Sequence, residues 1–258
     1  MFGSMTGLRL TVDGPVARVV LDRPEVRNAQ TPAMWAELAD FGTALPSDVR
    51  VVVVSGEGPS FSAGLDRRLI MGDNDLGEEP LLSLGAKPAD ELDKLIAHFQ
   101  AGFSWLRNPQ IVSVAAVQGH AVGAGFQLAL ACDLRVVTPD AKFSMREPAL
   151  GLVPDLGGTK PLVELIGYAR ALEICATTRW VEADEAKELG LANIVVPADE
   201  LAATVKDLTD AVLAPLPGAI RETKALLLGA ADRSYDDQLK AERTAQARRL
   251  KELTAALG

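Results

Sequence analysis

Two glycine-rich turns constrain the fold of this chain more than any other feature. The first is Phe61-Ser62-Ala63-Gly64-Leu65-Asp66, and the second is Gly119-His120-Ala121-Val122-Gly123-Ala124-Gly125. Each turn follows an apolar run typical of a buried strand and precedes a segment that reads as a helix. Such a unit leaves unpaired backbone N–H groups at a helix N-terminus, where they stabilise an anion or a developing oxyanion. Two units in one chain predict an α/β fold with an oxyanion site at the end of its sheet.

Strands and helices alternate through the first part of the chain, and helices dominate afterwards. Thr31 and Pro32 predict the start of a helix that runs to about Ala44. We expect a hairpin around 13–15, a strand buried on both faces at 49–55, and further strands at 111–117, 134–137, 142–144 and 194–196. Other helices are expected at 63–71, 90–106, 123–131, 157–165, 169–176, 183–189, 201–214, 218–228 and 234–253, with a loop at 72–88. The pattern predicts a parallel α/β core over residues 1–196 and a helical C-terminal region over residues 197–258.

Composition excludes several classes of function. The net charge of −9 over 258 residues disfavours general binding to nucleic acid. The apolar runs are far shorter than the ~20 residues of a membrane-spanning helix, and no signal peptide is recognised, so we expect a cytoplasmic protein. Cys132 and Cys175 stand in apolar contexts and predict free thiols. Neither His98 nor His120 forms a ligand pattern with them, so no metal site is expected.

One carboxylate stands out beside the two turns. Glu147 follows the short strand 142–144 and is itself followed by Pro148. A carboxylate beside an apolar pocket has a raised pKa and serves as a general acid or base. Competing motifs fit less well: the second turn has Leu128 where a dinucleotide-binding fingerprint needs a small residue, and Gly-x-Ser-x-Gly is absent.

The two turns, the step Ala131-Cys132-Asp133 and the stretch from Glu147 to Thr159 jointly resemble the crotonase (enoyl-CoA hydratase/isomerase) superfamily. The resemblance runs from about Leu8 to the C-terminus. It implies a crotonase-like (ClpP/crotonase) spiral β-sheet core that carries an acyl-CoA site, with C-terminal helices that serve oligomerisation and cover the active site. It also implies a homotrimer or a dimer of trimers, an acyl-CoA thioester as substrate, and no cofactor apart from the coenzyme A of that substrate.

The resemblance assigns roles to particular groups. The N–H groups of Ala63 and Ala124 would hold the thioester carbonyl, while Glu147 would move a proton to or from the acyl chain. The residues implied in binding the CoA thioester are Arg27, Ala29, Ala63, Gly64, Leu65, Asp66, Gly123 and Ala124. For Asp66, a helix cap or a salt bridge is an equal alternative.

Gln127 departs from the hydratase pattern, which has a second glutamate at this position. A glutamine orients a water molecule or holds Glu147, but it accepts no proton at neutral pH. This departure favours double-bond isomerisation over the hydration of a 2-enoyl-CoA, and a non-catalytic acyl-CoA-binding protein is the third alternative. Asp155 stands where dienoyl-CoA isomerases have an aspartate, so it is either a second catalytic carboxylate or the N-cap of the helix 157–165.

Overall fold

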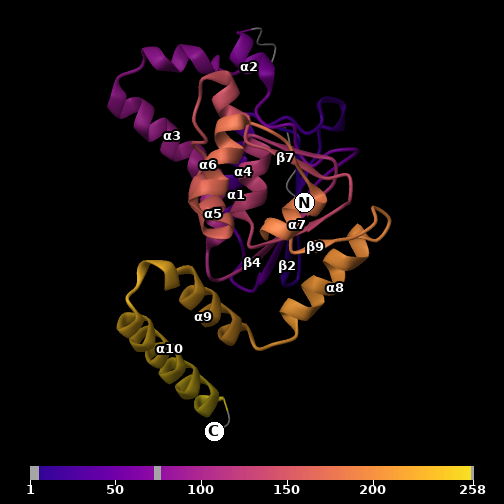
Figure 1. Ribbon diagram of the computed structural model, residues 1–258. Coiled ribbons are helices and arrows are strands. Elements are labelled where there is room, and N and C mark those ends of the chain that lie inside the picture. Colours follow the sequence, from indigo (N-terminus) through magenta and orange to yellow (C-terminus); the bar gives the residue numbers. More distant parts are fainter. Residues whose placement is uncertain (1–5, 73–76, 257–258) are drawn as a thin grey trace.

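A six-stranded sheet in the order β1-β2-β3-β4-β6-β9 organises the computed structural model, which describes residues 6–72 and 77–256 (Figure 1). The predicted hairpin is present, with β1 and β2 antiparallel, and the remaining strands continue the sheet in parallel. A second sheet has the order β5-β7-β8. The strands are β1 (Leu8–Asp13), β2 (Val16–Leu21), β3 (Val51–Gly56), β4 (Val112–Val117), β5 (His120–Val122), β6 (Leu134–Val137), β7 (Lys142–Ser144), β8 (Val181–Glu182) and β9 (Ile194–Val195).

Helices pack against strands of both sheets. They are α1 (Pro32–Thr43), α2 (Arg67–Met71), α3 (Ala89–Ser104), α4 (Ala124–Ala131), α5 (Thr159–Ile166), α6 (Tyr168–Thr177), α7 (Ala183–Leu189), α8 (Leu201–Leu213), α9 (Pro217–Leu228) and α10 (Tyr235–Ala255). Helix α1 begins as predicted, because the Thr31 hydroxyl accepts a hydrogen bond from the N–H of Met34 at 3.4 Å. Within residues 6–72 and 77–256, no helix is both long and apolar enough to cross a membrane.

The central strands are buried on both faces. In β3, Val52 and Val54 belong to the main core, whereas Val51 and Val53 belong to a second cluster that includes Val205 of α8. This alternation follows the two-residue period of a strand. The predicted double burial of this strand is therefore confirmed, and α8 covers the sheet face opposite the main core.

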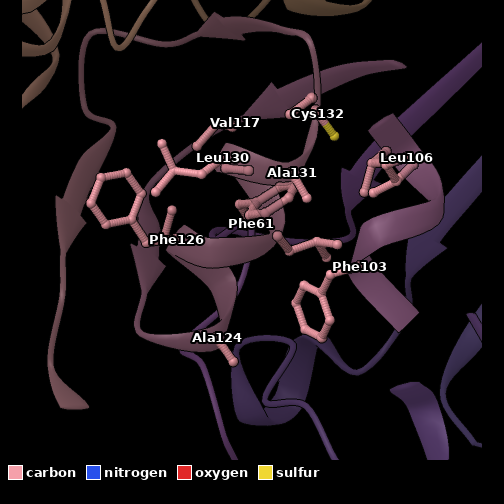
Figure 2. Packing of buried hydrophobic residues seen from close by; sticks show 14 of the residues in the cluster. Phe61, Phe103, Leu106, Val117, Ala124, Phe126, Leu130, Ala131 and Cys132 are labelled. Carbon is pink, nitrogen blue, oxygen red and sulfur yellow. The ribbon is translucent and has the colours of Figure 1, made fainter. Parts of the chain in front are cut away.

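Helix α4 lies inside the protein, and all eight of its residues are buried. Figure 2 shows Phe126 and Leu130 of this helix in the main core, in the same cluster as Phe61 and Val117. Because Phe61 belongs to the first glycine-rich turn and α4 follows the second, packing of the core fixes the two turns relative to each other.

The structure differs from the sequence-based expectations in three places. Residues 63–66 are not helical, and α2 begins only at Arg67. Part of the predicted 72–88 loop forms a 3-10 helix, η2 (Leu81–Ala86), while residues 73–76 of that loop lie outside the described residues. The short strands β5 and β8 lie in segments expected as turn and loop, because both form through pairing with distant segments, above all with β7.

The C-terminal helices divide into two groups. Helix α8 packs on the sheet, whereas α9 and α10 lie beside each other and extend away from the core at the lower left of Figure 1. The Nζ atom of Lys224 ties α9 to the core through a 2.7 Å ion pair with Asp133 and a 2.8 Å hydrogen bond to the carbonyl of Ile111. The predicted boundary at 196/197 separates strand from helix in the chain, but the first helix beyond it forms part of the layered core.

Helices α1 and α3 pack so closely that the space between them can be tested by substitution. At Gly102 of α3, an added Cβ would lie only 2.5 Å from the carbonyl oxygen of Trp35 in α1. We expect Gly102→Ala to lower the free energy of unfolding by about 1–3 kcal/mol through overpacking, although alanine favours a helix. Urea unfolding measures this change. Gly85→Ala is the control, because a Cβ at Gly85 meets no atom within 4 Å. An unchanged midpoint for Gly102→Ala would contradict the prediction.

Candidate active site

The two glycine-rich turns lie side by side. The N–H of Ser62 donates to the carbonyl of His120 at 2.8 Å, and the N–H of Val122 donates to the carbonyl of Ser62 at 3.0 Å. Gly64 adopts a φ of +86°, and a Cβ there would lie 2.5 Å from the carbonyl oxygen of Val122. Only glycine fits this close approach, which brings the backbone of the first turn to the N-terminus of α4.

At this junction, two residues that line a cavity have backbone N–H groups that donate to no acceptor within the part of the chain that the structure describes. One belongs to Ala124, the first residue of α4, where a helix leaves its N–H unpaired. The other belongs to Leu65, whose neighbours Gly64 and Asp66 make the two hydrogen bonds of a bridge to Gln30. Both residues line the cavity described below.

Ala63 differs from the role expected of it. Its N–H donates to the carbonyl of Arg27 at 2.8 Å, so a protein acceptor already occupies it. Arg27 has a left-handed φ of 52°, which turns its carbonyl toward the first turn. The free donor on this turn is therefore the N–H of Leu65, two residues further along the chain.

Glu147 lies against the second turn, where it begins the 3-10 helix η4 (Glu147–Leu150). Its Oε1 atom accepts a 2.6 Å hydrogen bond from Nε2 of Gln127. Its Oε2 atom is buried and makes no hydrogen bond to any described residue. Burial raises the pKa of the Glu147 carboxyl, and the nearby Asp155 adds to this effect, while hydrogen bonds oppose it. The site thus holds a carboxylate with one fixed and one unpaired oxygen.

Gln127 fixes this geometry from a completely buried position. Its Oε1 atom accepts hydrogen bonds from the N–H groups of Leu156 at 2.9 Å and Gly158 at 3.3 Å. Because the carbonyl end of the amide must meet these two donors, the NH₂ end must face Glu147. From the sequence we expect Gln127 either to orient a water molecule or to hold Glu147, and in the structure it holds Glu147.

Asp155 lies in the segment that Gln127 anchors, and it lines the same cavity as Glu147. Burial raises the pKa of its carboxyl. Its carbonyl accepts a 2.7 Å hydrogen bond from Nε2 of Gln100 on α3. Helix α5 begins at Thr159 with Gly158 as its N-cap, so the interpretation of Asp155 as a helix cap is wrong.

The cavity has a volume of about 650 Å³ and brings these groups together. Its charged side chains are Arg67, Arg146, Glu147 and Asp155, and most other lining residues are apolar. Sequence analysis missed Arg146, whose guanidinium lies 4.8 Å from the centre of the Trp180 ring. The only signal for it was its position next to Glu147. The lining residues are Trp35, Ala63, Gly64, Leu65, Arg67, Ile70, Leu81, Leu82, Leu84, Gly85, Leu92, Ile96, Phe99, Val122, Gly123, Ala124, Arg146, Glu147, Ala149, Leu150, Leu152, Val153, Asp155 and Leu156.

Asp66 stabilises the first turn. Its side chain caps α2 by accepting from the N–H of Arg68 and also forms ion pairs with Arg23 at 3.1 Å and Arg68 at 2.8 Å. The hydrogen bond from the Arg68 side chain is the largest cause that lowers the pKa of this carboxyl to about 2. The expected alternatives of helix cap and salt bridge are thus both present.

Arg27 and Ala29 lie outside the cavity lining. The side chain of Arg27 is exposed, and the carbonyl of Ala29 accepts a 2.6 Å hydrogen bond from Arg23. Gly64, Leu65, Gly123 and Ala124 therefore line the cavity. The 27–29 segment contacts the first turn but does not line the cavity.

Comparisons with known proteins agree on the family. The family model described as enoyl-CoA hydratase/isomerase matches residues 11–256. A crystal structure of a candidate enoyl-CoA hydratase from Thermobifida fusca is 52% identical, with a TM-score of 0.93 over 97% of this chain and 95% of that one. Crystal structures described in the same words, from the same organism and 52% and 51% identical to this chain, contain CoA and acetoacetyl-CoA respectively.

Two curated relatives carry a different activity in their names. The peroxisomal Δ(3,5)-Δ(2,4)-dienoyl-CoA isomerase of Arabidopsis thaliana is 30% identical over 90% of this chain and 84% of its own length. The mitochondrial enzyme of that name from Rattus norvegicus is 34% identical over 87% of this chain and 69% of its own length. The names of relatives therefore divide between hydration and isomerisation.

The buried Glu147 carboxyl generates a prediction on stability. Because burial raises its pKa in the folded state, folding becomes less favourable as pH rises from the unfolded pKa through the folded pKa. Glu147→Gln removes this titration and keeps an oxygen that accepts from Gln127. We expect the variant to melt at a higher temperature than the wild type at about pH 7.5, with the difference vanishing near pH ~4.

The control for this experiment is Glu188→Gln, which changes an exposed glutamate on α7. Melting temperatures are followed by circular dichroism across the pH series. A variant that is less stable than the wild type at neutral pH would mean that the Glu147 carboxylate stabilises the fold.

Proposed function

The chain belongs to the enoyl-CoA hydratase/isomerase family, and from this premise we propose that it shifts a carbon–carbon double bond of an enoyl-CoA. The observation that carries the proposal is the hydrogen bond from Gln127 to Glu147. Hydration by a carboxylate pair needs a second group that takes a proton from water, and the buried amide at position 127 accepts none. Moving a proton between two carbons needs only one carboxylate, which returns to its starting state in each cycle.

In the proposed mechanism, the thioester carbonyl accepts hydrogen bonds from the N–H groups of Leu65 and Ala124. These donors stabilise the negative charge that develops on the oxygen when a proton leaves the acyl chain. Oε2 of Glu147 takes this proton from one carbon and returns it to another carbon of the same conjugated system, and the double bond moves in consequence. The pKa of the Glu147 carboxyl is raised by burial, and a raised pKa suits a carboxyl group that both accepts and donates a proton.

Asp155 extends the proposal to dienoyl substrates. It lines the cavity with Glu147, and the names of two relatives give a dienoyl-CoA isomerase activity. In a conjugated diene, the carbons that lose and gain a proton lie farther apart than in a monoene. We assign Asp155 the role of second proton carrier. Glu147 takes a proton from one carbon, and Asp155, protonated at the start, gives a proton to the other carbon. The two carboxyl groups then return to their starting states by exchanging protons with solvent before the next cycle.

Hydration of a 2-enoyl-CoA is the second candidate, because the Thermobifida relative at 52% identity is described as a candidate enoyl-CoA hydratase. CoA and acetoacetyl-CoA in the other two Thermobifida structures support an acyl-CoA ligand for this chain. We extend the CoA site to Arg27, Ala29 and Asp66 near the first turn. Assembly as a homotrimer or a dimer of trimers remains part of the proposal, as do a cytoplasmic location and the absence of a cofactor.

A panel of thioesters distinguishes the candidates. We expect wild-type protein to convert 3-enoyl-CoA or 3,5-dienoyl-CoA into an isomer of equal mass, and to add little water to crotonyl-CoA. Chromatography with mass spectrometry separates these products.

Glu147→Gln should lower the rate of isomerisation about 10²–10⁴-fold, because a general acid–base catalyst is lost. Asp155→Asn should impair the dienoyl reaction more than the monoenoyl one.

The other results of the panel would each contradict the proposal. Efficient gain of water by the wild type would support hydration, and binding without conversion of any thioester would support a binding protein. Wild-type turnover by Glu147→Gln would remove Glu147 from the mechanism.

The oxyanion donors can be tested separately. Ala124 is the first residue of α4, a position at which proline keeps the helix but has no N–H. We expect Ala124→Pro to lower kcat about 10²–10³-fold, as loss of one oxyanion donor does. Ala124→Ser keeps the N–H and serves as the control, with circular dichroism to verify folding of both variants. Equal kcat values in folded Ala124→Pro and Ala124→Ser would exclude this donor.

A further inference from the structure

Most of the cavity wall is apolar, including the parts formed by α3 and by the chain after Glu147. Helix α3 contributes Leu92, Ile96 and Phe99, whose spacing of four and three residues places them on one face of the helix. The chain after Glu147 contributes Leu150 and Val153 to the same cavity. A cavity of about 650 Å³ is much larger than the four-carbon acyl group of crotonyl-CoA requires.

This apolar lining continues onto the surface. Leu82 of η2 is 68% exposed, Val153 is 71% exposed and Leu150 is 49% exposed, yet all three line the cavity. We call these three residues the rim. Exposed apolar side chains that cluster at the mouth of a cavity indicate that an apolar group covers them. The rim is also continuous with the candidate active site, since Leu150 and Val153 lie in the segment between Glu147 and Asp155.

We propose that the site selects acyl-CoA substrates with an extended apolar tail, of medium chain length or longer, whose distal methylene groups lie along the rim. The inference rests on the proposed function, because it assigns the acyl chain to this cavity. The tail enters from the carboxylates, passes between α3 and the 150–156 segment, and leaves past Leu82. Short acyl groups leave the rim exposed to water and gain nothing from it.

Saturated acyl-CoAs test this inference without any turnover. Each methylene that moves from water into an apolar site contributes about 0.8 kcal/mol, which is a decrease of about four-fold in Kd. We expect calorimetric titrations of the wild type to give a Kd that falls by up to about this factor per methylene, from acetyl-CoA through hexanoyl-CoA to decanoyl-CoA.

The double variant Leu82→Ser and Val153→Ser tests the rim itself. Both side chains are largely exposed, so their replacement leaves the core intact. We expect the decrease of Kd with chain length to stop earlier in this variant, with at least a ten-fold weaker affinity than the wild type for decanoyl-CoA. Leu172→Ser is the matched control, because Leu172 is 50% exposed on α6 and lies outside the cavity lining. The control should keep the wild-type dependence on chain length.

The other possible outcomes reject either the tail site or the proposed function. Binding of acetyl-CoA with no gain for longer chains would reject the tail site and leave the proposed function standing. No binding of any acyl-CoA would reject the proposed function itself. A wild-type dependence on chain length in the rim variant would mean that the tail does not reach the rim. If that variant also lost self-association in analytical ultracentrifugation, a second copy of this chain would be the occupant of the rim.

Discussion

The amide of Gln127 is the interaction on which the candidate active site depends. Its NH₂ end holds Glu147, and its carbonyl end holds the backbone at Leu156 and Gly158. One buried side chain therefore sets both the orientation of the first carboxylate and the path of the segment that carries Asp155. A buried amide that satisfies its polar groups with three partners is a rigid element, because any rotation leaves a donor or an acceptor unpaired in the interior.

This rigidity continues into the core. Gln127 lies on α4, and that helix is buried along its whole length against residues that include Phe61 of the first turn. Packing of the core, pairing of the two turns and the amide network therefore reinforce one another. A site of this kind is preorganised, which the proposed stabilisation of a developing oxyanion requires. Its placement depends on the β3 and β4 strands, whose alternating side chains are covered by helices on both faces.

Local sequence signals predicted the elements that local interactions determine. Thr31 and Pro32 marked the start of α1, and the β-branched run before Gly56 marked β3. The resemblance to a known family brought Glu147, Gln127 and Asp155 into the site. Sequence reasoning failed where distant segments meet. The acceptor for the Ala63 N–H is Arg27, and the partners of the Gln127 amide lie 20–31 residues further along the chain. No local pattern reveals such contacts, and β5 and β8 were missed for the same reason.

The fixed amide also determines where the proton resides when Glu147 is neutral. Nε2 of Gln127 only donates, and a carbonyl oxygen accepts a hydrogen bond better than the hydroxyl oxygen of a carboxylic acid does. The neutral carboxylic acid consequently favours the tautomer that carries its O–H on Oε2. A free carboxyl group in water samples both tautomers equally, whereas this one carries its acidic hydrogen on Oε2, the atom that moves the proton in the proposed mechanism. Under the proposed mechanism, the asymmetry of this one hydrogen bond fixes the face from which the proton reaches the substrate.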